Sequence, residues 1–352
     1  MTDRIGRRSF LAGALAAPMA LACAEVRGQE QEQPPAPATL DLHIHLFGTG
    51  DAGSGCRLSN RITSGWQFNL LLSRFRGRAG TLDESYVVTL VEDLKASGLA
   101  RGLILAQDAV YDAAGKPDWK QTHFFAPNDY LFRVVDQHRD LMFPCVSINP
   151  NRADAVDELD RCVDKGARAL KIHPPTQNVD IADPKHTRFF QRCADHRILV
   201  LVHTGHEHSA PVQDIGLASP LKLEPALDQG CTVVACHCGT GWPGDKPDML
   251  PDFLTMLRKY ERLWGDSSVL CTIGHAADCL RLIDDELGRE RLLHGSDFPF
   301  PCAPIAFSGI VKQDELTRIR TLDSELARDL ALKDALGIGR TCAERAHQLV
   351  AG

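Results

Sequence analysis

LDLHIHLF at residues 40–47 is the stretch that decides the fold, because apolar and polar side chains alternate along it. Side chains two apart on a β-strand project from the same face. We therefore expect Asp41, His43 and His45 on one face and the aliphatic side chains on the other. Two histidines at this spacing can bind one divalent ion through neutral ring nitrogens. On their own they are weak evidence, because histidines at a strand end also bond to backbone or water.

Three later apolar segments each end in a polar side chain of a kind that binds metal. They are short and rich in branched residues, which indicates buried parallel strands. The segments and their polar residues are 197–205 with His203, 231–239 with His237, and 291–299 with Asp297.

Strand-like and helix-like segments alternate along the chain. The other strand-like segments are residues 100–106, 141–148, 167–174 and 268–275. Residues 153–165 and 251–263 have helical periodicity and a glycine near their ends. This alternation predicts a parallel sheet covered by helices, and the span fits the ~250 residues of a (β/α)8 TIM barrel. The predicted fold is therefore α/β, a barrel whose strand ends form the catalytic rim.

The order of these motifs resembles the amidohydrolase superfamily, and more narrowly the amidohydrolase 2 branch of TIM-barrel metal-dependent hydrolases. The likeness covers most of the chain and rests on DLHIH at 41–45, KIHP at 171–174, HTG at 203–205, HCG at 237–239 and GSDFP at 295–299. The resemblance implies that His43, His45, His203 and Asp297 are the metal positions. It also implies that His237 either binds a second ion or polarises the substrate.

The residue types favour the same chemistry. Neutral imidazoles with one carboxylate suit Zn²⁺, and also Mn²⁺ or Fe²⁺. Such an ion lowers the pKa of bound water from about 16 to about 7. Asp297 would accept the proton of that water and pass it to the leaving group, and His237 would donate to the developing oxyanion. The alternative for Asp297 is a loop or helix-capping role.

Lys171 leaves the number of ions open. It shares a strand face with His173, and binuclear members of the superfamily carry a strand-four lysine whose carbamate bridges two ions. The amidohydrolase 2 branch usually holds one ion, and Lys171 would then pair with a carboxylate or bind an anionic substrate. We favour one ion per chain, with a second ion held by carbamylated Lys171 and His237 as the alternative.

The substrate-binding candidates are His173, Glu207 and Arg57. The first two follow predicted strands on the rim. Arg57 lies within residues 48–81, a long segment with aromatic and arginine side chains. Loops of this length are usually functional, which indicates a lid over the substrate. Solvent-exposed charge explains the arginines equally well.

Four further polar residues carry expectations about orientation. Cys236 and Cys238 flank His237 on a strand, so both should face the helix layer. His294 precedes Asp297 by an odd number of positions and should point away from that carboxylate. His275 would end the seventh strand and support the site from behind.

Residues 1–24 have the features of a twin-arginine export signal, with paired arginines at 7–8, an alanine-rich apolar run and a small-residue cleavage site. Residues 25–38 form a Gln/Glu/Pro linker that we expect to be disordered, and residues 39–352 form the barrel domain. We therefore expect a periplasmic protein without a membrane span. Lipid anchoring at Cys23 is a weaker alternative.

Composition indicates a globular enzyme. The chain has 39 basic and 46 acidic residues and a net charge of −7, with no basic stripe, so we expect no nucleic-acid partner. Residues 313–350 should form a helical extension whose charges, from 314 to 333, face solvent. The resemblance implies that the last helix closes the barrel. Homo-oligomerisation stays open.

The predicted function is a metal-dependent hydrolase that cleaves a C–O or C–N bond of a small molecule, such as a lactone, ester or amide. A decarboxylase or hydratase that uses the same ligands is the alternative. An exported metal-binding or ligand-binding protein is the more distant one.

Overall fold

The computed structural model describes residues 38–352, apart from residues 76 and 78. The export signal and the linker up to residue 37 lie outside the described residues, so they stay predictions. Among the described helices, none is long and apolar enough to cross a membrane.

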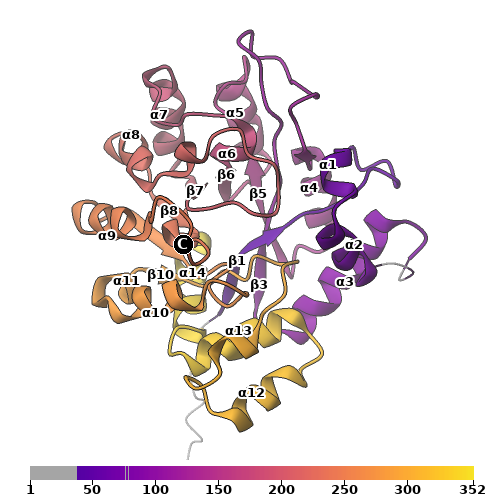
Figure 1. Ribbon diagram of the computed structural model, residues 1–352. Coiled ribbons are helices and arrows are strands. Elements are labelled where there is room, and N and C mark those ends of the chain that lie inside the picture. Colours follow the sequence, from indigo (N-terminus) through magenta and orange to yellow (C-terminus); the bar gives the residue numbers. More distant parts are fainter. Residues whose placement is uncertain (1–37, 76, 78) are drawn as a thin grey trace, which may run out of the picture. The chain divides into compact units, whose positions relative to one another are not determined.

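Eight parallel strands form one sheet, with helices around it (Figure 1). In order around the sheet they are β1 (Leu40–His45), β3 (Arg101–Leu105), β5 (Met142–Ser147), β6 (Ala169–Ile172), β7 (Leu199–His203), β8 (Val233–Cys236), β9 (Leu263–Asp266) and β10 (Leu292–Leu293). The first and last strands are joined by backbone hydrogen bonds. The amide of Leu42 donates to the carbonyl of His294 over 3.0 Å, and that of His45 to Phe298 over 2.9 Å. The predicted (β/α)8 barrel is confirmed.

The helices of the described residues follow the strands in sequence. The longer ones are α2 (Trp66–Ser73), α3 (Leu82–Ala96), α4 (Asn128–Gln137), α5 (Ala155–Asp164), α7 (Thr187–His196), α9 (Leu250–Lys259), α10 (Ala276–Asp284), α12 (Gln313–Arg320), α13 (Glu325–Ala335) and α14 (Arg340–Ala351). The shorter ones are α1 (Asn60–Thr63), α6 (Pro174–Gln177), α8 (Glu224–Asp228) and α11 (Glu286–Glu290). The predicted helix at 153–165 is α5, and Gly166 follows it with φ +91°, the left-handed conformation that ends many helices.

The seventh strand is not where the sequence indicated. The predicted strand at 268–275 is a series of turns, and the strand itself, β9, lies at 263–266 within the end of the predicted helix. Its sequence, LWGD, has no branched run, so the amphipathic pattern of the helix seemed to continue through it. Gly265 is a strand residue rather than a helix cap. A larger residue would not fit there, because a Cβ would lie 2.5 Å from Cys238 Sγ. His275 consequently precedes α10 instead of ending a strand.

A β-bulge in β1 changes which residues face the barrel interior. The register of β1 against β3 shifts between Asp41 and Ile44, which means that one strand has an extra residue. Leu40 and Leu42 pack in the interior cluster, whereas Ile44 packs in the cluster under the helices. His43 and Leu42 therefore both face inward. The prediction that Asp41 shares a face with His43 is wrong, because the bulge interrupts the alternation.

The C-terminal helix closes the opposite end of the barrel from the strand ends. Ala346 and Val350 of α14 belong to the same apolar cluster as the interior side chains of the first strand residues, such as Leu40 and Leu199. The closing role that the resemblance implied for the last helix is confirmed. This apolar floor leaves the C-terminal ends of the strands as the polar half of the interior.

The segment at 48–81 packs against the barrel mouth. It contains β2 (Arg57–Leu58), which pairs with β4 (Phe124–Phe125). The Phe75 ring centroid lies 6.3 Å from that of Phe298, and Arg74 Nη1 donates to the Pro299 carbonyl over 2.9 Å. The segment thus contacts the residues that follow Asp297. Its function as a lid stays a prediction.

Candidate active site

Three of the predicted ligands meet where β1 and β10 close the barrel. Asp297 Oδ1 lies 3.1 Å from His43 Nε2 and 3.2 Å from His45 Nε2. A ring nitrogen of His237 lies within 4.8 Å of ligand atoms of His43 and Asp297. All four side chains are buried or nearly so. We call His43, His45, His237 and Asp297 the seam cluster.

The loop after β10 places Asp297 by bonding to β1. Asp297 has φ +65°, and its amide donates to the His43 carbonyl over 2.9 Å. Gly295 lies so close to β1 that a Cβ there would be 2.7 Å from the Cβ of His43. Only glycine allows this approach without a backbone shift.

Asp266, at the end of β9, is the functional residue that the sequence prediction missed. Its Oδ2 lies 2.7 Å from His43 Nδ1, and its Oδ1 accepts a 2.9 Å hydrogen bond from the His237 amide. Burial alone would raise the pKa of Asp266, but His43 beside it holds that pKa well below its usual range. The residue was missed because the strand that carries it was misplaced.

The hydrogen bonds assign the tautomer of His43. Because the ionised Asp266 accepts at Nδ1, that nitrogen carries the proton and Nε2 presents its lone pair to Asp297. Burial, with Lys171 nearby, lowers the pKa of His43 to about 3, so the ring is neutral at pH 7.

His237 is oriented through Ser268. Its Nδ1 lies 2.8 Å from Ser268 Oγ, and the Ser268 hydroxyl in turn donates to Asp266 Oδ1. Ser268 therefore accepts from Nδ1, which leaves a lone pair at Nε2. Burial lowers the pKa of His237. In its neutral form the ring can accept a hydrogen bond or bind an ion at Nε2, and the predicted donor role requires a second proton.

This arrangement fits a bound cation. Nitrogen lone pairs and a carboxylate oxygen repel one another at about 3 Å unless a positive charge lies between them. The Asp297 carboxylate is buried at this position. Within the described residues its Oδ1 has no hydrogen-bond donor. Two imidazoles and a carboxylate are a donor set that Zn²⁺ and similar ions take.

Lys171 lies inside the barrel beside the seam cluster. It is fully buried, and its Nζ is 3.3 Å from His43 Nε2. No carboxylate of the described residues makes an ion pair with it. The expected carboxylate partner is thus not seen in this part of the chain, whereas anion binding and carbamylation both stay open.

The thiols on either side of His237 point in different directions. Cys236 belongs to the interior cluster and Cys238 to the outer one. The prediction for Cys236 is wrong because alternation along β8 places Cys236, like Val234, in the barrel interior. The prediction for Cys238 is confirmed. His237 and Cys238 have φ values of +64° and +55°, so strand alternation ends at His237.

A second group of side chains lies on the neighbouring strand ends. His173 Nε2 is 3.0 Å from Glu207 Oε2, and His203 Nδ1 is 3.9 Å from the same oxygen. The rings of His173 and His203 stack at 3.9 Å. We call these three residues the loop cluster. The His203 ring centroid lies 4.7 Å from that of His237, so His203 contacts both clusters.

Glu207 is held by the loop that follows β7. Its Oε1 accepts from the amides of Ser209 and Ala210 at 2.5 and 3.0 Å. Burial would raise its pKa, but His173 and Ser209 lower it to about 2. Both ring nitrogens of His203 are buried without a hydrogen-bond partner among the described residues, as expected of a ring that binds an ion or a substrate.

The remaining candidates lie apart from both clusters. Arg57 stacks over Trp119 at 4.3 Å from the ring centroid, and no described hydrogen bond or ion pair joins it to the clusters. His294 points away from Asp297, as predicted, with Nε2 3.9 Å from carboxylate oxygens of Asp41 and Asp329.

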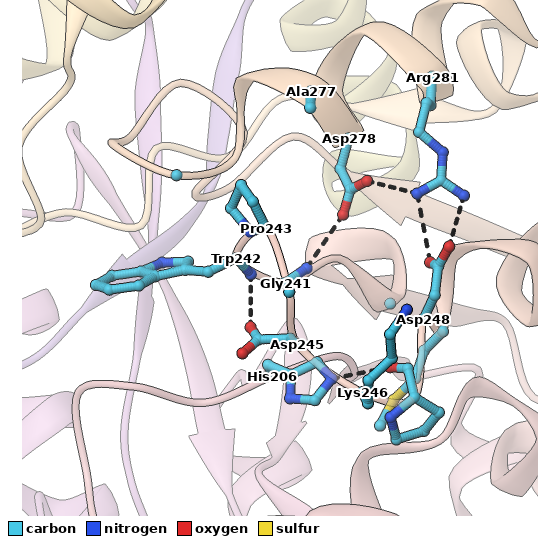
Figure 2. Close-up of a pocket in the computed structure, with 15 residues that line it drawn as sticks. His206, Gly241, Trp242, Pro243, Asp245, Lys246, Asp248, Ala277, Asp278 and Arg281 are labelled. Carbon is cyan, nitrogen blue, oxygen red and sulfur yellow. Dashed lines mark hydrogen bonds and ion pairs between the residues drawn. The ribbon is translucent and has the colours of Figure 1, made fainter.

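A cavity of about 240 Å³ lies beside α10 and the loop after β8 (Figure 2). Its arginine is already paired with two of its carboxylates, since Arg281 bonds to both Asp248 and Asp278 at 2.8 and 2.7 Å. Its lining includes no residue of either cluster. The two clusters, rather than this cavity, form the candidate active site.

Comparison with known proteins identifies the family of the chain. Residues 41–333 match the amidohydrolase family model. The chain belongs to the amidohydrolase family, whose members are metal-dependent enzymes. The resemblance seen in the motifs is therefore confirmed. No curated protein matches the sequence.

Solved structures share the fold at low sequence identity. An uncharacterised TIM-barrel protein from Bordetella bronchiseptica has a TM-score of 0.58 at 17% identity, covering 90% of this chain and 100% of that one. A protein provisionally assigned as a 2-pyrone-4,6-dicarboxylic acid hydrolase, from Pseudomonas putida, has 0.53 at 16%, covering 90% and 98%. A 5-carboxyvanillate decarboxylase from Novosphingobium aromaticivorans, with bound manganese, has 0.50 at 12%, covering 89% and 97%.

Proposed function

We propose that this protein is a metal-dependent hydrolase that cleaves a C–O or C–N bond of a small molecule, such as a lactone, ester or amide. The observation that carries the proposal is the Asp297 oxygen between two histidine nitrogens, buried and without a donor in the described chain. The similarity to a protein assigned as a pyrone dicarboxylic acid hydrolase supports it.

The ligands of the ion would be His43, His45 and Asp297, with His203 from the loop cluster. We favour one Zn²⁺, Mn²⁺ or Fe²⁺ per chain. When bound, a divalent ion of this kind supplies Lewis acidity and lowers the pKa of water. Burial keeps His43 neutral, and Asp266 fixes its proton on Nδ1, so that the Nε2 lone pair would face the ion.

The proton transfers fall to this chain's carboxylate and imidazoles. Asp297, ionised at neutral pH, accepts the proton of the attacking water and returns it to the leaving group. His237 accepts a hydrogen bond at Nε2 from the same water and so orients it. Glu207 and His173 bind polar groups of the substrate, and Lys171 binds a negatively charged one.

A second function has one observation in its favour. Lys171 is a buried amine without a described carboxylate partner, so a substrate carboxylate could occupy its vicinity. A decarboxylase would use such a contact, and one of the similar structures is a decarboxylase with bound manganese. A hydratase belongs to the same alternative.

One assay separates these reactions. The protein loaded with Zn²⁺ or Mn²⁺ is incubated with lactones, esters, amides and aromatic carboxylates, and products and CO₂ are measured. Hydrolysis without CO₂ supports the proposal, whereas CO₂ release without hydrolysis replaces it with the decarboxylase. Ion binding without any turnover would indicate a binding protein.

We also propose that the protein is exported to the periplasm by its twin-arginine segment. Cell fractionation tests this, with replacement of Arg7 and Arg8 by lysine. The variant should remain in the cytoplasm, and a periplasmic variant would contradict the proposal.

A further inference from the structure

A buried lysine of the C-terminal extension contacts the loop that carries Asp297. Lys333, in α13, is fully buried, and its Nζ donates to the Gly295 carbonyl and to Asp329 Oδ2, both over 2.6 Å. Asp329 is only 4% exposed. The expectation that the charges from 314 to 333 face solvent is therefore wrong for these two residues, because they pair with each other against the barrel.

Gly295 is held through both of its backbone groups. Its carbonyl accepts from Lys333 and, over 3.4 Å, from the Ser267 hydroxyl, while its amide donates to Ser267 Oγ over 3.3 Å. The next amide, of Ser296, donates to Asp41 Oδ1 over 3.0 Å. The amide of Asp297 bonds to β1 as described above. Each peptide from 295 to 297 thus has an anchor, and the only charged side chain among the donors is Lys333.

These anchors matter because Asp297 has an unfavourable backbone conformation. A residue with a side chain and a φ of +65° persists only where its surroundings hold it. Lys333 is suited to this role, since a charge-assisted bond is stronger than a neutral one and Asp329 balances the buried charge. The contact also links α13 to the loop that carries Asp297.

We propose that Lys333 is a positioning residue. Through the Gly295 carbonyl it fixes the loop from 295 to 297, and so holds the Asp297 carboxylate at the nitrogens of His43 and His45. The effect on the loop is independent of the proposed function, whereas the effect on ion binding rests on it.

Hydrogen exchange of the ion-free protein tests the effect on the loop. In Lys333→Met, exchange of the Ser296 and Asp297 amides should rise about tenfold or more, since a hydrogen bond to a charged group is lost. The variant also leaves Asp329 unpaired, and it could fail to fold for that reason. The double variant Lys333→Met with Asp329→Leu removes both charges and should show the same local increase.

Arg345→Met is the matched control. Arg345, in α14, also donates to a carbonyl of the β10 region, that of Leu292, over 2.5 Å, but at the start of the strand. The Arg345→Met variant should leave hydrogen exchange of the Ser296 and Asp297 amides within about twofold of wild type. Wild-type exchange in the Lys333 variants, or an equal increase in the control, would overturn the proposal.

Mn²⁺ affinity, measured by calorimetry, tests the effect on the site. Lys333→Met should weaken binding about tenfold, as changes behind a ligand do. In an Asp297→Asn background the same change should have no further effect, because Lys333 acts through Asp297. A loss that persists in that background would mark a general structural effect and contradict the proposal. A wild type that binds no ion would contradict the proposed function alone, and the exchange experiment would still decide the role of Lys333.

Discussion

The two clusters at the barrel mouth are supported in different ways. In the seam cluster, His43 and His237 are oriented by Asp266 and Ser268, at the end of β9 and just beyond it, all fully buried or nearly so. In the loop cluster, the supporting carboxylate is Glu207, which is held by the backbone of its own loop. Side chains on packed strands are placed more precisely than those on loops. The seam cluster, together with His203 on β7, is thus suited to hold an ion, and His173 and Glu207 are suited to accommodate a substrate.

The largest effect should come from Asp297→Asn. The amide keeps the size of the side chain but removes the negative charge and the proton acceptor, so kcat/KM should fall by about 10²–10⁴. Turnover of the substrate found in the panel checks this, with the melting temperature as the folding control. Retained turnover would remove Asp297 from the reaction and end the distinction between the clusters.

Asp266→Asn should weaken the binding of Zn²⁺ or Mn²⁺ by about 10- to 100-fold, because the amide no longer fixes the proton on His43 Nδ1. Glu207→Gln is the matched change in the loop cluster and should alter ion affinity by less than about threefold. Titration calorimetry of both variants measures the difference. Equal losses of affinity would show that Glu207 supports the ion site as much as Asp266 does.

The pH dependence of stability should also distinguish His43 from His173. The pKa of His43 is about 3 when folded and 6.5 when unfolded, so the unfolded state binds more protons between these values. Its contribution to the free energy of unfolding is fully present above pH 6.5 and is lost as the pH falls. At pH 5 the loss is about 2 kcal/mol in the ion-free protein.

Urea unfolding of ion-free wild type and His43→Gln at pH 7 and 5 checks this, because the variant should lose less stability on acidification. His173→Gln should reduce the loss by a smaller amount. Burial lowers the pKa of His173 too, but Glu207 partly offsets it. An acid response in His43→Gln identical to that of wild type would contradict the assigned neutral state.

The smallest effect should come from Glu207→Gln on catalysis. If Glu207 binds substrate, KM should rise by up to about tenfold while kcat changes little, because such binding is equal in the ground and transition states. Steady-state kinetics on the identified substrate measures both constants. A fall in kcat at constant KM would move Glu207 from substrate binding to the chemistry.

Parts of the site were predictable because they depend on local patterns. His203, His237 and Asp297 follow apolar strand segments, His43 lies in an alternating one, and parallel strands bring their carboxyl ends to one rim. Asp266 was not predictable in this way, because β9 is four residues long and has no branched run. The bulge in β1 was equally invisible, since the sequence alternates without interruption through it.

The sequence by itself determined the barrel, the family and the polar residues at the strand ends, because periodicity and strand polarity act over a few residues. Only the tertiary structure decided which side chains support those residues. His43 and Asp266 are 223 positions apart in the chain. Lys333, in helix α13, contacts Gly295 in the loop after β10. Such contacts depend on how strands and helices pack around the closed sheet. They could not be predicted, because no local pattern of residues encodes that packing.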